Sequence, residues 1–163
     1  MLFRSDERIP SVSAAHTSGA DQAMRHLLEL GHRRIAQITG PRGWLATEDR
    51  RRGYRAALAA AGILPDPALE VEAVPEIVPG RDAAESLLDL PDPPTAIFAF
   101  NDNIAIGAIQ AARAHGMRVP EDLSVVGFDD VEHATIVTPA LTTVRQPLAR
   151  SSTSDRSDRK SVV

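Results

Sequence analysis

The sequence contains no cysteine. This absence excludes disulfide bonds, thiolate catalysis and zinc or iron–sulfur sites with cysteine ligands. An apolar run of the ~18 residues that a membrane-spanning helix needs is also missing, and no charged-then-apolar signal segment opens the chain. The net charge of −4 disfavours nucleic-acid binding by this chain, because phosphate contacts need clustered cations. We therefore expect a cytoplasmic chain without a membrane partner.

Lysine is nearly absent as well, and its position sets the C-terminal end apart. The chain has 18 Lys and Arg residues, of which only Lys160 is a lysine. It lies in Ser151–Val163, a segment of mostly Ser, Asp and Arg without an apolar period. Such a composition is typical of disorder. We predict that 148–163 is a disordered tail, and both a native and a non-native origin remain open for it.

The rest of the sequence alternates between strand and helix patterns. Its 163 residues, 43% of them hydrophobic, suffice for one domain with a real core. Apolar residues at helical spacing stop at glycines, and short apolar runs lie between these segments. Ser18 and Asp21 resemble a capping box at the start of the first helix. The pattern predicts helices at 18–30, 47–61, 81–90 and 102–114, and strands at 34–39, 71–74, 95–100, 123–128 and 141–144.

This alternation predicts an α/β fold with a doubly wound, mainly parallel sheet of strand order 2-1-3-4-5. The continuous apolar run Ala96–Phe100 supports the prediction, because strands covered by helices on both faces are apolar throughout. Open sheets of this kind bind their ligands at the carboxyl ends of the strands.

Polar residues and the single tryptophan follow those strand ends. Carboxylates and a guanidinium can bind vicinal hydroxyls, and an indole ring can cover the apolar face of a sugar. The pattern therefore predicts a site for a polyol or sugar at one edge of the sheet. The residues concerned are Trp44, Thr47, Arg50, Arg51, Arg52, Pro75, Glu76, Asn101, Asp102, Asp129 and Asp130.

Each of these residues also has a purely structural interpretation. Asn101 and Asp102 are residue types that cap helices, and Asp129 with Asp130 could begin a turn. Trp44 could pack a loop, and the arginines could form a solvated helix face. Their convergence on one edge favours a binding site, because independent caps and turns would not gather there.

Motifs of catalysis and metal binding are not found. The five histidines have no metal-ligand spacing, and the sequence has no Gly-x-Ser-x-Gly, P-loop or Gly-x-Gly-x-x-Gly. We expect a protein that is not an enzyme and that has no metal and no cofactor.

Five blocks of sequence carry a resemblance to a known family. In this order and spacing they resemble the effector-binding domain of LacI-type transcriptional regulators, the lactose and purine repressors among them, which is similar to type I periplasmic sugar-binding proteins. The resemblance covers roughly 9–148. The blocks are LLELGHRRIAQITG (27–40), RRGYRAAL (51–58), PPTAIFAFNDNIAIGA (93–108), RVPEDLSVVGFDD (118–130) and LTTVRQP (141–147).

The resemblance implies a function and a set of site residues. It implies that the chain senses a sugar or nucleoside-like effector, and that Arg50, Asn101 and Asp129 contact it. Trp44 and Ala46 fall in the loop that sets effector choice. Pro75 stands where the family often has an aromatic residue, a departure that weakens the case for stacking from that side.

The resemblance also implies a domain organisation. Residues 1–15 would be a remnant of the first subdomain and its crossover, and 16–147 the second subdomain. The helix-turn-helix through which the family binds operator DNA is not in the sequence, so we expect poor effector affinity and no DNA binding from this chain. A homodimer of the full-length protein is expected, with Ile104, Ala105 and Ala108 offering apolar surface for it.

Two other interpretations remain. A periplasmic sugar-binding receptor of the same fold would need a signal peptide, and LTTVRQP resembles the repressors more closely. A phosphoacceptor receiver domain has the same strand order, but it requires an acidic pair after the first strand, where this chain has Thr39, Gly40 and Pro41.

Overall fold

The computed structural model describes residues 8–129 and 141–144. Within them the strands form one sheet of order β2-β1-β3-β4-β5, and each of the four strand pairs is parallel. The predicted fold class and strand order are confirmed. The elements are α1 (Arg8–Glu29), β1 (Ile35–Thr39), α2 (Leu45–Ala60), a 3-10 turn (Pro67–Leu69), β2 (Glu70–Glu72), α3 (Ile77–Leu88), β3 (Ala96–Ala99), α4 (Asp102–Ala114), β4 (Ser124–Phe128) and β5 (Thr142–Val144).

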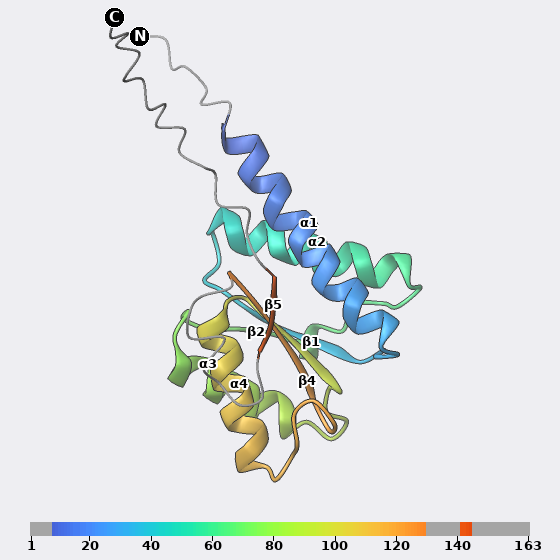
Figure 1. Ribbon diagram of the computed structural model, residues 1–163, viewed down its shortest axis with the longest axis vertical. Coiled ribbons are helices and arrows are strands. Elements are labelled where there is room, and N and C mark those ends of the chain that lie inside the picture. Colours follow the sequence, from blue (N-terminus) through green and yellow to red (C-terminus); the bar gives the residue numbers. More distant parts are fainter. Residues whose placement is uncertain (1–7, 130–140, 145–163) are drawn as a thin grey trace, which may run out of the picture.

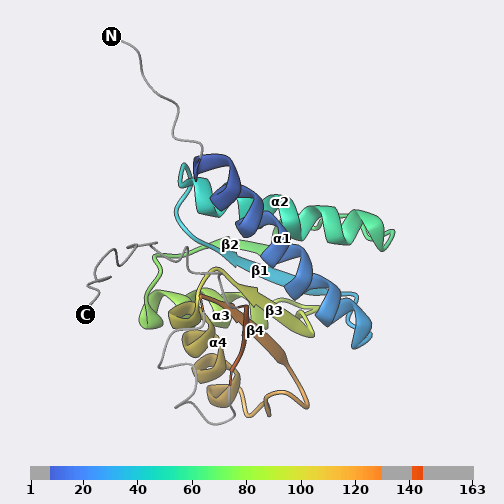
Figure 2. The same cartoon turned by 45° about the horizontal axis from the view of Figure 1, so that its top comes forward.

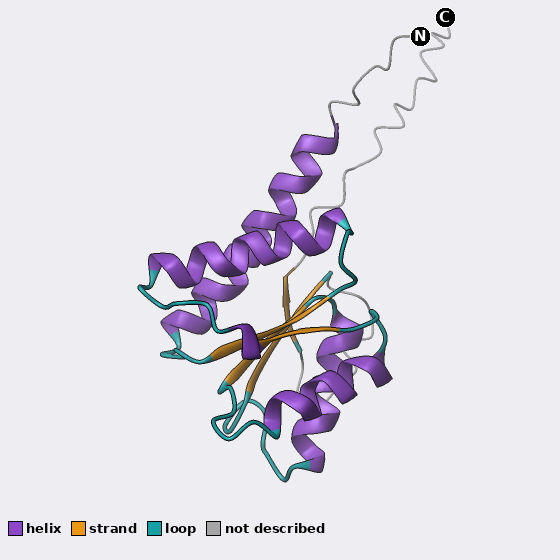
Figure 3. Ribbon diagram, turned by 180° about the vertical axis from the view of Figure 1, so that it is seen from behind, coloured by secondary structure: helices purple, strands orange, loops and turns teal. Residues whose placement is uncertain are grey.

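The sheet separates two pairs of helices. Helices α1 and α2 lie on one face and α3 and α4 on the other, as Figures 1 and 3 show from opposite sides; Figure 2 shows the same layers from a second direction. The side chains of β3 alternate between two cores. Ala96 and Phe98 pack under α1 and α2, whereas Ile97 and Ala99 pack under α3 and α4. This double burial explains why the strand is apolar throughout.

Helices α3 and α4 approach each other closely at two glycines. A Cβ on Gly107 would collide with the carbonyl oxygen of Ile77, and one on Gly80 would collide with Ile104. The contact buries the side chains of Ile104, Ala105 and Ala108 completely. The prediction that these three offer surface to a second copy is therefore wrong, because α3 and the sheet already cover them.

Most element bounds lie within a few residues of the predicted ones, with two larger differences. Helix α1 begins at Arg8 rather than near Ser18, whose hydroxyl donates to the carbonyl of Ala15 inside the helix. The predicted capping box is therefore wrong. Helix α3 begins four residues early, at Ile77, because its first turn tolerates Pro79.

Several predictions concern residues outside the described ranges. They are Asp130, the segment after Val144 and the predicted tail at 148–163. In the described part of the chain, no helix is both long enough and apolar enough to cross a membrane.

Candidate ligand-binding site at the carboxyl edge of the sheet

Several of the predicted site residues meet at one edge of the sheet, whereas Arg51 and Arg52 pair with Glu70 and Asp49 instead. Because β1, β3 and β4 are parallel, their carboxyl ends share that edge. Trp44 and Arg50 follow β1, Asn101 follows β3, and Asp129 follows β4. The sequence prediction that Asn101 and Asp129 lie on the same edge is thus confirmed.

Arg50 is the centre of this edge. It projects from the second turn of α2, and only 3% of it is exposed. Its guanidinium carbon lies 4.4 Å from the ring centroid of Phe100 and 3.8 Å from that of Phe128. Aromatic faces attract a cation at such distances, so the ring that follows β3 and the ring that ends β4 hold the guanidinium.

The guanidinium also has polar partners. Nη1 donates to the carbonyl oxygen of Phe100. Nη2 donates to Oδ1 of Asp129 over 3.0 Å and lies 3.4 Å from Nδ1 of His16. Burial lowers the pKa of Arg50, and the nearby Asp129 opposes that shift. Arginine nevertheless stays charged in proteins, so this buried cation depends on its partners.

Asp129 has an uncommon backbone conformation. Its φ is +100°, and no other described residue apart from glycines has a positive φ. The amide of Asp129 donates to the carbonyl of Val144 over 3.0 Å, which ties this turn to β5. A residue in such a conformation costs about 1–3 kcal/mol and persists where its surroundings hold it, often at functional sites. The Asp129 side chain keeps about a third of its surface exposed, at 32%.

Asn101 caps helix α4. Its Oδ1 accepts from the amide of Ile104 over 3.0 Å, and its Nδ2 donates to the carbonyl of Pro75 over 3.3 Å. The structural interpretation of Asn101 as a cap is therefore confirmed. Both ends of its amide have partners within the chain, and its predicted ligand contact stays a prediction.

Asp102 does not cap the helix. Its side chain is 1% exposed, and Oδ1 accepts from the hydroxyl of Thr143 on β5 over 2.6 Å. A Cβ on Gly127 would collide with this carboxylate, so glycine is needed at that position of β4. Asp102 thus joins α4 to the last strand.

Trp44 offers an exposed ring beside the buried arginine. The residue precedes α2, and 51% of it is exposed. Its ring packs edge-on against Phe100, with centroids 6.3 Å apart. Ala46 is half-buried against the core beneath α3 and α4. The predicted loop therefore lies beside Arg50, with about half of Trp44 open to solvent.

His16 lies in this site although it was not among the predicted site residues. This half-buried residue of α1 contacts Arg50 and the ring of Phe128, whose centroid lies 6.1 Å away. Burial is the largest influence on the pKa of His16 and lowers it, and the charge of Arg50 lowers it further. The carboxylates of Asp49 and Asp129 act in the opposite direction. No local signal pointed to it, because the predicted helix began beyond it.

The other described histidine contacts are structural. His32 bridges the amino edge of the sheet, with its two ring nitrogens each 2.9 Å from a hydroxyl, those of Thr95 and Ser124. His115 pairs with Asp89 at the end of α3. No group of three or more His, Cys, Asp or Glu side chains suited to a metal is found in the part of the chain that the structure describes.

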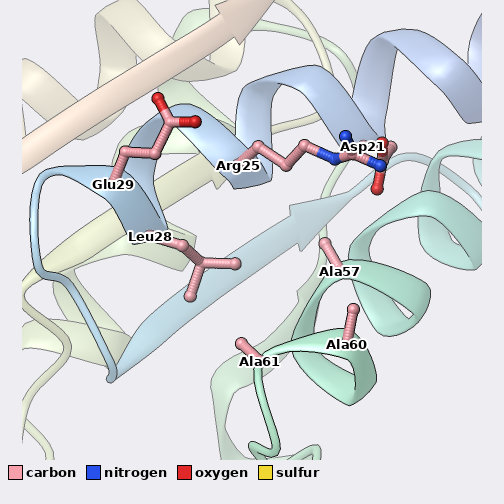
Figure 4. Close-up of a pocket in the computed structure, with 7 residues that line it drawn as sticks. All are labelled: Asp21, Arg25, Leu28, Glu29, Ala57, Ala60 and Ala61. Carbon is pink, nitrogen blue, oxygen red and sulfur yellow. Dashed lines mark ion pairs between the residues drawn. The ribbon is translucent and has the colours of Figure 1, made fainter.

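A separate hollow lies between α1 and α2 (Figure 4). Ala57, Ala60 and Ala61 line one side of it, and Leu28 and Glu29 lie on the other. Arg25 and Asp21, which also line it, pair with each other over 2.8 Å. It contains none of the predicted site residues.

Comparison with known proteins identifies the family. A family profile described as "Periplasmic binding protein-like domain" matches residues 24–153. The chain belongs to this family.

Its relatives are LacI-type regulators. It is 39% identical to the HTH-type transcriptional repressor CytR of Escherichia coli (strain K12) over 145 residues, which cover 89% of this chain and 42% of that protein. It is 44% identical to the ribose operon repressor of the same strain over 130 residues, covering 79% and 39%. The chain thus spans less than half the length of these curated relatives.

Solved structures give the same result. A LacI-family regulatory protein from Chloroflexus aggregans matches with a TM-score of 0.79 and 37% identity, covering 81% of this chain and 48% of that one. The transcriptional regulator CelR in complex with cellobiose matches with a TM-score of 0.78 and 43% identity, covering 81% and 40%. The predicted resemblance is confirmed, and these relatives, which are repressors and regulators rather than enzymes, do not favour the periplasmic receptor.

Proposed function

We propose that this chain is the effector-sensing part of a LacI-type transcriptional regulator, and that the carboxyl edge of its sheet binds a hydroxyl-rich small molecule, a sugar or nucleoside. The observation that carries the proposal is the pair formed by buried Arg50 and strained, partly exposed Asp129. A fold gains little stability from holding an aspartate in that conformation. A ligand that binds a carboxylate in a fixed place explains why Asp129 keeps this backbone conformation.

The chemistry of the edge suits a hydroxyl-rich ligand. The Asp129 carboxylate can accept from two neighbouring hydroxyls, and Arg50 fixes the direction of that carboxylate through the 3.0 Å bond. The exposed Trp44 ring can cover the apolar face of a sugar. Asn101, whose amide is engaged, would add to recognition mainly by setting where α4 begins.

The ligand class follows the same chemistry. Among the relatives, CelR has been solved with cellobiose and another protein is named as a ribose operon repressor. A sugar is therefore the first class to test here, and a nucleoside, which carries ribose hydroxyls, the second.

The proposal extends to the protein of which this chain would form part. Operator DNA would be bound in the cytoplasm through a helix-turn-helix domain, and the working unit would be a homodimer. Ile77 and Val78 at the start of α3 are 36% and 55% exposed and offer apolar surface for such a contact. Sedimentation at micromolar concentration tests the dimer, and a strict monomer would count against it.

Calorimetric titration of the full-length protein with D-ribose, cellobiose and adenosine tests the site. Truncating Asp129 or Arg50 to alanine removes a charge-assisted hydrogen bond worth about 1.5–3 kcal/mol and leaves its partner unpaired, so affinity should fall about tenfold to a few hundredfold. Asp92→Ala is the matched control, since Asp92 is an exposed carboxylate at the opposite edge of the sheet, paired with Arg34. Equal affinity in all three variants would contradict the proposal.

A further inference from the structure

We propose that His16 is a further ligand-recognising residue of this site, one that donates a hydrogen bond from Nε2 to a hydroxyl of a neutral, polyhydroxylated ligand held by Asp129. The inference rests on the proposed function and names one more group of the same site. Its basis is the position of the imidazole in α1, between the guanidinium of Arg50 and the solvent.

Contacts on one side of the ring fix its orientation. Nδ1 lies 3.4 Å from Nη2 of Arg50, and the ring leans on Phe128 at an interplanar angle of 38°. Since Arg50 is almost fully buried, Nδ1 points inward. Nε2 lies on the far side of the ring from this contact, and the residue as a whole is half-buried. No hydrogen bond joins Nε2 to any residue that the structure describes.

The partner of Nδ1 also decides which nitrogen carries the proton. A guanidinium can only donate, so Nδ1 must accept, and the proton of a neutral imidazole then sits on Nε2. The charged groups that face the ring are Arg50 and Asp49 from α2 and Asp129 after β4. Burial and Arg50 together outweigh the carboxylates and lower the pKa of His16. His16 is therefore a neutral donor at neutral pH.

A donor at this place completes the site. A ligand hydroxyl both donates and accepts, and Asp129 can only accept from it. The Arg50 Nη1 group is used by the Phe100 carbonyl and the Asn101 amide by the Pro75 carbonyl. The Nε2–H of His16 can donate to the oxygen whose proton Asp129 accepts. The same arrangement disfavours an anionic ligand, which would meet the Asp129 carboxylate.

The test compares two substitutions of His16 with a matched control. His16→Phe keeps the ring against Phe128 and removes both nitrogens, whereas His16→Gln keeps a donor near the position of Nε2 and cannot titrate. The control is His26→Gln, an exposed histidine ten residues further along α1. Binding to the full-length protein is measured by calorimetry from pH 5 to pH 8, with the member of the panel D-ribose, cellobiose and adenosine that the unmodified protein binds most tightly.

At pH 8, His16→Phe should weaken binding about threefold to tenfold, the effect of one neutral hydrogen bond, and His16→Gln should restore most of it. The unmodified chain and His26→Gln should bind less tightly at pH 5, because a protonated His16 no longer accepts from Arg50. His16→Gln should lack that dependence. If His16→Phe does not fold, the pH dependence of ligand binding by His16→Gln is the deciding measurement.

The outcomes separate the two proposals. Normal affinity and normal pH dependence in the His16 variants, with a loss in Asp129→Ala, would overturn the role of His16 and leave the site. Unchanged affinity in Asp129→Ala as well, or no binding of any panel member, would overturn both.

Discussion

Replacing Asp129 by glycine and by alanine separates the strain at this position from its ion pair. Both substitutions remove the carboxylate that pairs with Arg50. Only alanine retains a Cβ, which a φ of +100° disfavours. We therefore predict that Asp129→Gly is more stable than Asp129→Ala by about 1–2 kcal/mol.

The comparison needs a position with ordinary geometry. Asp89 ends α3 with φ −80° and ψ −3°, and it too has a partner, His115. There the order should reverse, because glycine costs about 0.5–1 kcal/mol relative to alanine where φ is normal. The glycine variant should thus be the more stable of the two at position 129 and the less stable of the two at position 89.

Urea unfolding of the four variants measures these differences. If the transition is two-state, the shift in midpoint at constant slope gives the change in the free energy of unfolding. A result in which Asp129→Ala is as stable as Asp129→Gly would refute the claim of strain, and with it the argument that a ligand explains why this conformation is held.

Three further predictions concern other parts of the fold. Asn101→Ala removes the cap of α4 and should cost about 1 kcal/mol of stability in thermal melts; if it also weakens effector binding about tenfold or more, Asn101 contacts the ligand directly. Gly107→Ala forces a methyl group against the backbone of α3 and should cost about 1–3 kcal/mol, whereas no loss would mean that α3 and α4 separate freely. Burial lowers the pKa of His32 below its ordinary 6.5 in the folded chain. As the pH falls below about 6.5, the unfolded chain therefore binds a proton at His32 more readily than the folded chain, and the free energy of unfolding should fall. His32→Gln should flatten that part of the stability–pH curve, and an unchanged slope would assign the pH dependence to other groups.

The order of the strands and the edge that carries the site could be predicted from the sequence because both follow from local signals. Alternating elements with short connections allow few parallel topologies, and Asn101 marks the start of α4 through its own cap. In a parallel sheet, residues that follow successive strands must then share an edge.

The contacts within the site could not be predicted, because they join residues far apart in the sequence. Arg50 is buried between two rings at the ends of different strands, and Asp102 pairs with Thr143 on β5. His16 enters the site only because α1 begins earlier than its cap-like residues suggest. The burial of Ile104 depends in the same way on Gly80 of a neighbouring helix.

The most direct test of the central claim is an NMR titration of the ¹⁵N-labelled chain with D-ribose, cellobiose and adenosine. The chain has one tryptophan, so the indole N–H signal of Trp44 reports the carboxyl edge without ambiguity. We predict a saturable shift of that signal and of the Asp129 amide with at least one ligand, and its loss in Asp129→Asn. Saturable shifts confined to the amino edge around His32 and Asp92, or no binding at all, would contradict the account.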